Sequence, residues 1–284
     1  MTNIDYIEQS IDIFEDSLKA GGSRPYSSVK ALSEKIGYSS HYLSRLFQSL
    51  CGQPMGQYML KRRLSEAYLR IRDTDEVIRN IAAELGWEDY SSFSRAFKKE
   101  FAVSAGKART TVQPGLDNKL TVRTRPANPA FEGFSKEPVL CRLPPLHVTG
   151  LVFFMDGSEK TFHKPWHVYA KNQHKIKGVL SPELTYQCSF WPEDEDPSHG
   201  MWILCAKETD PEVRQDVMFF SKRFSNISAL SFTHTGPVES MHHTYAYIWG
   251  EYLPKSVFKP TGNFEFQRYV ENTDAIEILL PVST

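Results

Sequence analysis

Two stretches of the chain, about fifty residues apart, repeat the same pattern. The first reads GYSSHYLSRLF and spans residues 37–47, and the second reads GWEDYSSFSRAF and spans residues 86–97. In each copy a short apolar segment ends at a glycine, and a second segment starts at a serine or aspartate. Glycine readily adopts the left-handed conformation that a tight turn between helices requires. The repeat therefore predicts two helix-turn-helix units.

The second segment of each unit has one apolar face and one polar face. Leu43, Leu46 and Phe47 in the first copy, and Phe93, Ala96 and Phe97 in the second, are predicted to point inward. Small hydroxyl side chains allow close approach to a groove, and an arginine can bind O6 and N7 of guanine together. We therefore expect the outward residues to contact DNA: Ser40, His41, Tyr42, Ser44, Arg45, Tyr90, Ser91, Ser92, Ser94 and Arg95.

The segment between the two units, MGQYMLKRRLSEAYLRI, predicts a connecting helix of about 15 residues, roughly 23 Å long. Its basic run of Lys61, Arg62 and Arg63, together with Lys98 and Lys99, is expected to contact phosphates. We call the second helix of each unit its reader helix. Such a spacer could place the two reader helices in neighbouring major-groove windows about 34 Å apart, and bending of the DNA would cover the difference between 34 Å and the length of the spacer. The alternative is an ordinary helical bundle with solvated arginines, against which the duplication and the basic run argue.

The overall composition favours a protein without a membrane span. The net charge of −1 hides an asymmetry. Residues 29–112 hold 14 basic and 9 acidic side chains, about +5, whereas residues 133–284 hold 14 and 18, about −4. We expect only the basic half to meet a polyanion. Four dispersed cysteines and an acidic N-terminus favour a cytoplasmic protein with reduced thiols. No cofactor or metal site is expected: His163 and His167 have zinc-like spacing, but Pro165 separates them.

Residues 28–109 resemble the DNA-binding domain of the AraC/XylS transcription regulators. The resemblance rests on Gly52, Tyr58, Arg62/Arg63 and Ala67, and on the stretch from Ile81 to Lys99. It implies double-stranded DNA and RNA polymerase as partners, and it places base-reading positions at His41, Arg45, Ser91, Ser92 and Arg95. The chain departs from the family at its C-terminal edge, where Ala105, Ala108 and Arg109 stand in place of a proline and a Tyr-Arg pair. Because two readers lie on one chain, we expect a monomer.

After residue 112 the residue composition of the chain changes. Prolines punctuate residues 113–138, which we interpret as a linker between a DNA-binding domain at 1–112 and a second domain at 139–284. Five short runs favour strands: HVTGLVFFM, LTYQCSFW, MWILCA, ISALSFTHTG and AIEILLPV. Two segments, 161–177 and 240–252, favour helices. The expected fold is multidomain: an all-α N-terminal domain and an α+β C-terminal domain.

The stretches FTHTGPVESMHHTYAYIWGEYLPKSVF and FEFQRYVEN resemble the GyrI-like effector-binding domain. An AraC-type domain followed by a GyrI-like domain is the Rob-like order, which implies an activator that binds a small organic effector. Aromatic side chains with a few polar groups can hold such a molecule. We expect the effector at Trp166, Tyr169, Trp191, Trp202, Tyr247, Glu251, Glu265, Gln267 and Tyr269.

Three alternatives for this domain stay open. If Gln267 replaces the acid that often faces the cleft in the family, a preference for cationic effectors is lost. Glu265 with Tyr269 could imitate the acid and tyrosine of GyrI-like hydrolases. The domain could also be a protein-interaction module with a collapsed cleft.

Overall fold

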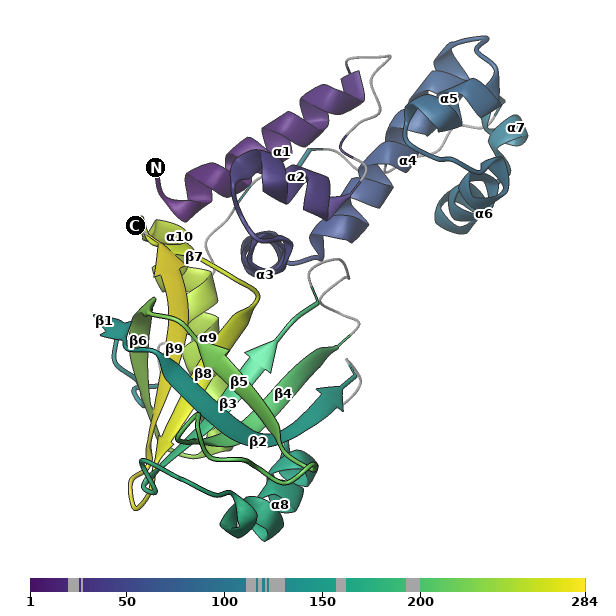
Figure 1. Cartoon of the computed structure of the whole chain (residues 1–284). Helices are drawn as coiled ribbons and strands as arrows, with labels where there is room; N and C mark the ends of the chain where they lie inside the picture. The colour runs from purple at the N-terminus through teal and green to yellow at the C-terminus, as the bar shows by residue number, and fades with distance from the viewer. Residues whose placement is uncertain are drawn as a thin grey trace. The chain divides into compact units, whose positions relative to one another are not determined.

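The structure is a computed structural model of the whole chain (Figure 1). It describes residues 1–19, 26, 28–110, 116, 119–120, 122, 131–156, 162–192 and 200–283. The chain divides into two compact units, Met1–Thr124 and Arg125–Thr284. Residues 123–130 of the predicted linker and the acidic stretch at 193–199 lie outside the described residues.

The N-terminal unit is helical in its described residues. Its helices are α1 (Asn3–Lys19), α2 (Val29–Ile36), α3 (Ser40–Cys51), α4 (Met55–Asp73), α5 (Ile78–Glu84), α6 (Tyr90–Phe101) and α7 (Ala105–Ala108). The pairs α2–α3 and α5–α6 are the two predicted helix-turn-helix units. Gly37 (φ 76°) and Gly86 (φ 92°) adopt the positive φ that both turns require. Ser39 caps α3, and Asp89 caps α6 through the N–H groups of Ser91 and Ser92.

The connecting helix α4 is longer than the sequence predicted. It contains 19 residues, about 28 Å, because it includes Met55 and Gly56 and continues to Asp73. Each half of α4 holds one reader unit through aromatic packing. Tyr58 contacts Phe47 of α3 (ring centroids 5.5 Å apart), and Tyr68 stacks on Phe97 of α6 (5.9 Å). One rigid helix therefore sets the spacing between the two units.

The C-terminal unit is an α+β domain built on an antiparallel sheet. Its strands are β1 (Val139–Leu143), β2 (Leu146–Met155), β3 (Leu184–Phe190), β4 (Met201–Glu208), β5 (Phe220–Phe224), β6 (Ile227–Thr235), β7 (Lys259–Pro260), β8 (Phe264–Val270) and β9 (Ala275–Ser283). The sheet order is β1-β6-β9-β8-β3-β4-β2-β5, and β7 pairs with β9. The helices are α8 (His163–Asn172), α9 (Met241–Tyr247) and α10 (Leu253–Lys255), with a π-helical segment at Ile248–Tyr252.

The sheet consists of two similar halves. In one, β2 is followed by α8, β3 and β4; in the other, β6 is followed by α9, β8 and β9. Strands β3 and β8 pair at the centre and join the halves. One face of the sheet carries an apolar core that includes Val148, Cys188 and Phe266. The opposite face carries α8, whose Tyr169 packs with Met155 and Ile203.

The described ranges contain neither a membrane-spanning helix nor a disulfide. No helix there is long and apolar enough to cross a membrane. The four cysteines are free thiols, and Cys188 and Cys205 are buried. Burial raises the pKa of the Cys205 thiol to about 12.

Candidate functional site

The outward face of α6 has the exposure that the sequence predicted. Tyr90, Ser91 and Arg95 are exposed, and Ser92 and Ser94 are half-buried. Lys98 and Lys99 are exposed on the following turn. Phe93 and Phe97 are fully buried on the other side of the helix. Helix α6 therefore presents hydroxyls, one guanidinium and two ammonium groups to solvent, while its aromatic side holds it to α4.

The outward face of α3 is smaller than predicted. Ser40, Ser44 and Arg45 are half-buried, but His41 is 3% exposed and Tyr42 is 0% exposed. The expectation that His41 and Tyr42 lie outward is therefore wrong. Tyr42 lies one turn before Leu46 and so joins the apolar stripe of the helix. The His41 ring lies against that of Tyr42, with centroids 5.1 Å apart. Burial, with the nearby charge of Arg45, lowers the pKa of His41 well below its usual value.

The three basic side chains at positions 61, 62 and 63 of α4 have different surroundings in the structure. Lys61 is half-buried, whereas Arg62 is 9% exposed and binds the Glu15 carboxylate of α1, so the expectation that Arg62 contacts phosphate is wrong. Arg62 Nε and Nη2 each donate to Glu15 at 2.7 Å, and the Tyr58 hydroxyl donates at 2.6 Å. The next side chain, Arg63, lies over the Trp87 ring, 4.7 Å from its centroid.

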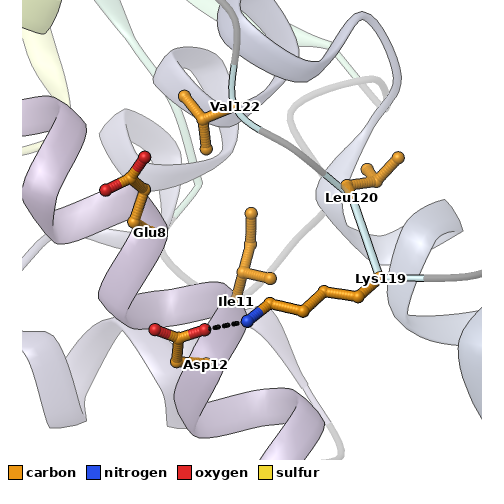
Figure 2. A pocket seen from close by; sticks show the side chains of 6 residues that line it. All are labelled: Glu8, Ile11, Asp12, Lys119, Leu120 and Val122. Carbon is orange, nitrogen blue, oxygen red and sulfur yellow. Dashed lines mark hydrogen bonds and ion pairs between the residues drawn. The ribbon is translucent and has the colours of Figure 1, made fainter.

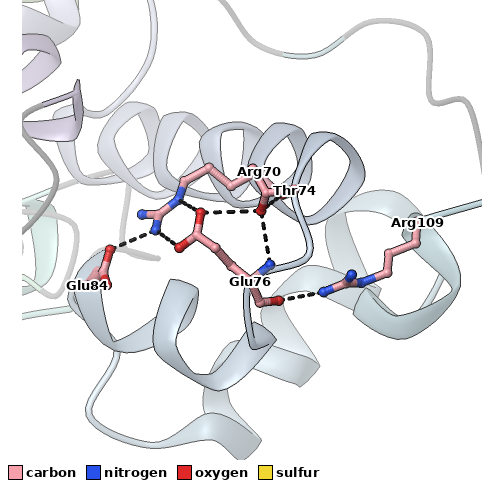
Figure 3. A network of polar contacts seen from close by, with 5 residues as sticks. All are labelled: Arg70, Thr74, Glu76, Glu84 and Arg109. Atoms are coloured by element: carbon pink, nitrogen blue, oxygen red, sulfur yellow. Dashed lines mark hydrogen bonds and ion pairs between the residues drawn. The ribbon is translucent and has the colours of Figure 1, made fainter.

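A second ionic network fixes the far end of α4 (Figure 3). Arg70 donates to Glu76 and to Glu84 of α5, the latter at 2.7 Å. Arg109 binds the backbone carbonyl of Glu76 and pairs with Asp75 at 3.3 Å. Arg109 stands where the AraC/XylS pattern has the arginine of its Tyr-Arg pair, next to the departure at Ala108. In this protein it ties the end of the reader domain to the loop before α5.

The C-terminal unit holds a group of buried and half-buried polar side chains on the helix-bearing face of the sheet. We define the polar cluster as Trp166, Gln187, Tyr245, Glu265, Gln267 and Tyr269. The Tyr269 hydroxyl donates to Gln267 Oε1 (2.6 Å), and Gln267 Nε2 donates to the Tyr245 hydroxyl (2.9 Å). That hydroxyl donates to Glu265 Oε1 (2.7 Å). The bonds therefore run in one direction and end on a carboxylate.

Gln187 of β3 is the most deeply buried member of the polar cluster. It lies opposite Gln267 in the pairing of β3 with β8, and it is 1% exposed. Trp166 Nε1 donates to its Oε1 at 2.7 Å, which fixes the orientation of the amide. Its buried Nε2 has no hydrogen-bond partner among the described residues. A buried donor in this state is a place where a bound acceptor gains a hydrogen bond without competition from bulk water.

Four of the nine predicted effector residues, Trp166, Glu265, Gln267 and Tyr269, belong to the polar cluster. Tyr169 adjoins it, because its ring meets the Trp166 ring edge-on at 5.8 Å. Burial raises the pKa of both Tyr169 and Tyr269. Trp191 lies just beyond the end of β3, where its backbone N–H donates to Asn263.

The structure moves three predicted residues away from the polar cluster. Trp202 is 47% exposed and packs on Phe154 (5.0 Å), because strand alternation puts it on the opposite face of the sheet from Ile203. Tyr247 follows Tyr245 by two helical positions, and so it turns away and donates to the Lys136 carbonyl at 2.8 Å. Glu251 forms an ion pair with Lys255 at 3.9 Å. None of the three belongs to the polar cluster, and a contact of these residues with an effector stays a prediction.

The sequence missed two members of the polar cluster, Gln187 and Tyr245. The signal for Gln187 was present: a lone amide inside the apolar run LTYQCSFW. Tyr245 had no comparable signal, since α9 carries several aromatic residues. Their positions also bear on the hydrolase alternative. The Tyr269 hydroxyl donates to Gln267, and the Tyr245 hydroxyl is the one that donates to Glu265; the hydrolase alternative stays untested.

A pocket lies in the N-terminal unit, between α1 and the residues Lys119, Leu120 and Val122 (Figure 2). It has a volume of about 320 Å³ and is lined by Glu8, Ile11, Asp12, Lys119, Leu120 and Val122. Lys119 donates to Asp12 across its floor, so opposite charges neutralise one another there. Within the described part of the chain, no group of three or more His, Cys, Asp or Glu side chains could hold a metal ion.

Two helix-turn-helix units on one rigid helix, followed by an α+β domain, define the class of helix-turn-helix transcription regulators with an appended second domain. Residues 32–111 match the helix-turn-helix domain family, and residues 136–283 match the GyrI-like small molecule binding domain family. The chain therefore belongs to the AraC/XylS regulators and to the GyrI-like family, with its domains in the Rob-like order.

Named relatives agree with this assignment for the first domain. The chain is 32% identical to the multiple antibiotic resistance protein MarA of Escherichia coli over 109 residues, which are 38% of this chain and 82% of MarA. It is 38% identical to the regulatory protein SoxS of Salmonella typhimurium over 73 residues, 26% of this chain and 68% of SoxS. A solved structure, the EcmrR C-terminal domain, is 14% identical, with a TM-score of 0.43, and the match covers 52% of this chain and 98% of that one.

Proposed function

We propose that this protein activates transcription by inserting α3 and α6 into neighbouring major-groove windows. The observation that carries the proposal is the rigid attachment of both reader helices to α4, through Tyr58 and Phe47 at one end and Tyr68 and Phe97 at the other. At about 28 Å, α4 is shorter than the 34 Å repeat of the groove, and bending of the DNA would cover the difference.

Base recognition is assigned to the side chains that remain outward. Arg45 and Arg95 bind guanine edges, and the serines at 40, 44, 91, 92 and 94 allow close approach. Tyr90 contacts the groove wall, while Lys61, Lys98 and Lys99 bind phosphates without reading sequence. Because one chain carries both readers, it binds as a monomer. RNA polymerase is the partner that activation requires.

The test uses duplexes that the full-length chain selects from a random pool. Arg45→Ala and Arg95→Ala should each cost about 1–3 kcal/mol of binding free energy on the selected duplex, with relaxed specificity at one position each. Arg72→Ala is the matched control, since Arg72 pairs with Asp73 at the far end of α4. A double variant of Arg45 and Arg95 that binds like wild type contradicts these assignments. Transcription in vitro with purified RNA polymerase then separates activation from repression.

We also propose that the polar cluster is the effector site. Gln187 Nε2 is the buried donor that would bind an acceptor atom of the effector. The rings of Trp166 and Tyr269 meet edge-on beside it, with their centroids 4.7 Å apart. The ligand class that fits is a flat organic molecule with a hydrogen-bond acceptor, such as a carbonyl or ether oxygen. Glu265 adds a preference for donors nearby. With Gln267 in place of a second acid, this site offers one carboxylate rather than two.

A ligand panel distinguishes these possibilities. Flat carbonyl compounds, cationic dyes and quaternary ammonium ions are titrated while tryptophan fluorescence, to which Trp166 contributes, is recorded. Binding of carbonyl compounds that Gln187→Leu abolishes supports the site, and Val152→Ala, on the other face of the sheet, is the control. Binding restricted to cations points to Glu265 as the determinant. No response to any compound favours a protein-interaction role for this domain.

A further inference from the structure

The four arginines of α4 differ in their partners. Arg62 binds Glu15, Arg70 binds Glu76 and Glu84, and Arg72 binds Asp73. Arg63 is half-buried, and among the described residues it forms no hydrogen bond or ion pair. Its contact is the face of Trp87, 4.7 Å from the guanidinium carbon. Burial without a carboxylate lowers the pKa of Arg63. Among the described residues, Arg63 is therefore the one arginine of this helix that lacks a counter-charge.

The position of Arg63 indicates what could supply that charge. Trp87 lies in the turn of the second helix-turn-helix unit, two residues before Asp89, the N-cap of α6. A second arginine, Arg79 of α5, lies over Tyr90, the first residue of α6, at 5.8 Å. Arg79 is exposed, and in the described ranges it too forms no ion pair. Two guanidinium groups without counter-charges thus lie on aromatic rings at the N-terminus of the reader helix.

The local field at this end of α6 favours an anion. The free N–H groups of a helix N-terminus carry a partial positive charge. The Asp89 carboxylate accepts hydrogen bonds from Ser91 and Ser92 and is used as the cap. Aromatic faces hold a guanidinium by cation–π attraction while leaving its N–H edge free for a second partner. In a helix-turn-helix domain the first helix crosses the DNA backbone beside the groove that the second helix enters.

We propose that Arg63 and Arg79 form a phosphate clamp, each binding a backbone phosphate of the groove that α6 enters. Trp87 and Tyr90 hold the two guanidinium groups in place before DNA arrives. The clamp rests on the proposed insertion of α6 and deepens it. The clamp changes the sequence interpretation, in which Lys61, Arg62 and Arg63 all contact phosphates. Arg62 binds Glu15 inside the protein, whereas Arg63 binds DNA. Arg79, which belongs to none of the motifs, is the second residue of the clamp.

The experiment measures how binding of the full-length chain depends on salt. Each phosphate contact that is lost should make the slope of log K against log salt concentration shallower by about 0.9. Arg63→Gln and Arg79→Gln should each show this change, and the double variant about 1.8, both on a selected duplex and on an unrelated duplex. Arg72→Gln, on the same helix, should keep the wild-type slope. Unchanged slopes for Arg63→Gln and Arg79→Gln overturn the clamp.

A second measurement keeps the proposal testable if Arg63→Gln unfolds. Arg63→Lys retains the charge, and comparing its NMR spectrum with that of wild type assigns the Arg63 Nε–H signal. That signal should shift when duplex is added to the wild-type chain, and a signal that stays in place overturns the role of Arg63. A wild-type chain that binds no duplex rejects the proposed function itself, whereas binding with unchanged slopes rejects only the clamp.

Discussion

Glu15 of α1 accepts two hydrogen bonds from Arg62 of α4, one from Nε and one from Nη2, each 2.7 Å long. Both side chains are buried, and Tyr58 donates to the same carboxylate. The two charges satisfy one another inside the N-terminal unit and fasten α1 to the helix that carries both readers. The ion pair of Glu15 and Arg62 therefore stabilises the fold of the N-terminal unit, and we do not expect it to contact DNA.

Removing one partner of this pair should destabilise the domain strongly. Arg62→Ala leaves the Glu15 carboxylate buried without a counter-charge, and we expect a loss of about 3–5 kcal/mol in the free energy of unfolding. Urea denaturation followed by circular dichroism measures it. Arg72→Ala, which breaks an exposed pair on the same helix, should leave the unfolding midpoint in place. Equal midpoints for Arg62→Ala and wild type would contradict the structural role.

The same pair should make stability depend on acidic pH. Burial by itself raises the pKa of Glu15, but hydrogen bonds from Arg62 and Tyr58 outweigh it and bring the pKa below the ordinary 4.5. The folded state then binds this proton more weakly than the unfolded state. The contribution is therefore present above pH 4.5 and is lost as the pH falls through the lower folded-state pKa. Urea titrations between about pH 7 and pH 3 should show the stability advantage of wild type over Glu15→Gln shrinking with acid. A constant difference refutes this.

Tyr42 should behave as a core residue, although the sequence predicted that it contacts DNA. Tyr42→Ala removes a fully buried ring, and we expect a loss of about 3–5 kcal/mol of stability. Ser44→Ala, two residues away on the outward face, should change stability by less than about 0.5 kcal/mol. Thermal unfolding of the two variants gives the comparison. If Tyr42→Ala weakens DNA binding while its melting temperature stays at the wild-type value, the residue is a reader after all.

The polar cluster should respond to loss of its central hydroxyl. Tyr245→Phe removes the group that accepts from Gln267 and donates to Glu265, leaving both buried polar groups short of a partner. The expected cost is about 1–3 kcal/mol. Tryptophan fluorescence follows this unfolding, since four of the five tryptophans (Trp166, Trp191, Trp202 and Trp249) belong to the C-terminal unit. Tyr90→Phe, on exposed α6, is the control. Unfolding of Tyr245→Phe at the wild-type midpoint would show that the hydroxyl contributes nothing.

The elements that could be predicted from the sequence are those with a local signal. A short stretch of sequence is enough to recognise the glycine turns at Gly37 and Gly86 and the apolar stripes of α3 and α6. The same holds for β2, β3, β4, β6 and β9, which largely coincide with the five short runs that favour strands. Strand β5 has no such run, because FSKRF is mostly exposed and has a neighbour on one side only, so the sequence interpretation omitted it.

What the sequence determined by itself is therefore the class of protein: a duplicated reader on a basic helix, followed by an α+β domain. The tertiary structure decided which polar side chains remain available to ligands. Arg62 and Glu15 are 47 positions apart, and Gln187 and Gln267 meet only through the pairing of β3 with β8. Periodicity fixes the direction of a side chain relative to its own helix or strand. Its charge partner comes from another element, and only packing brings the two together.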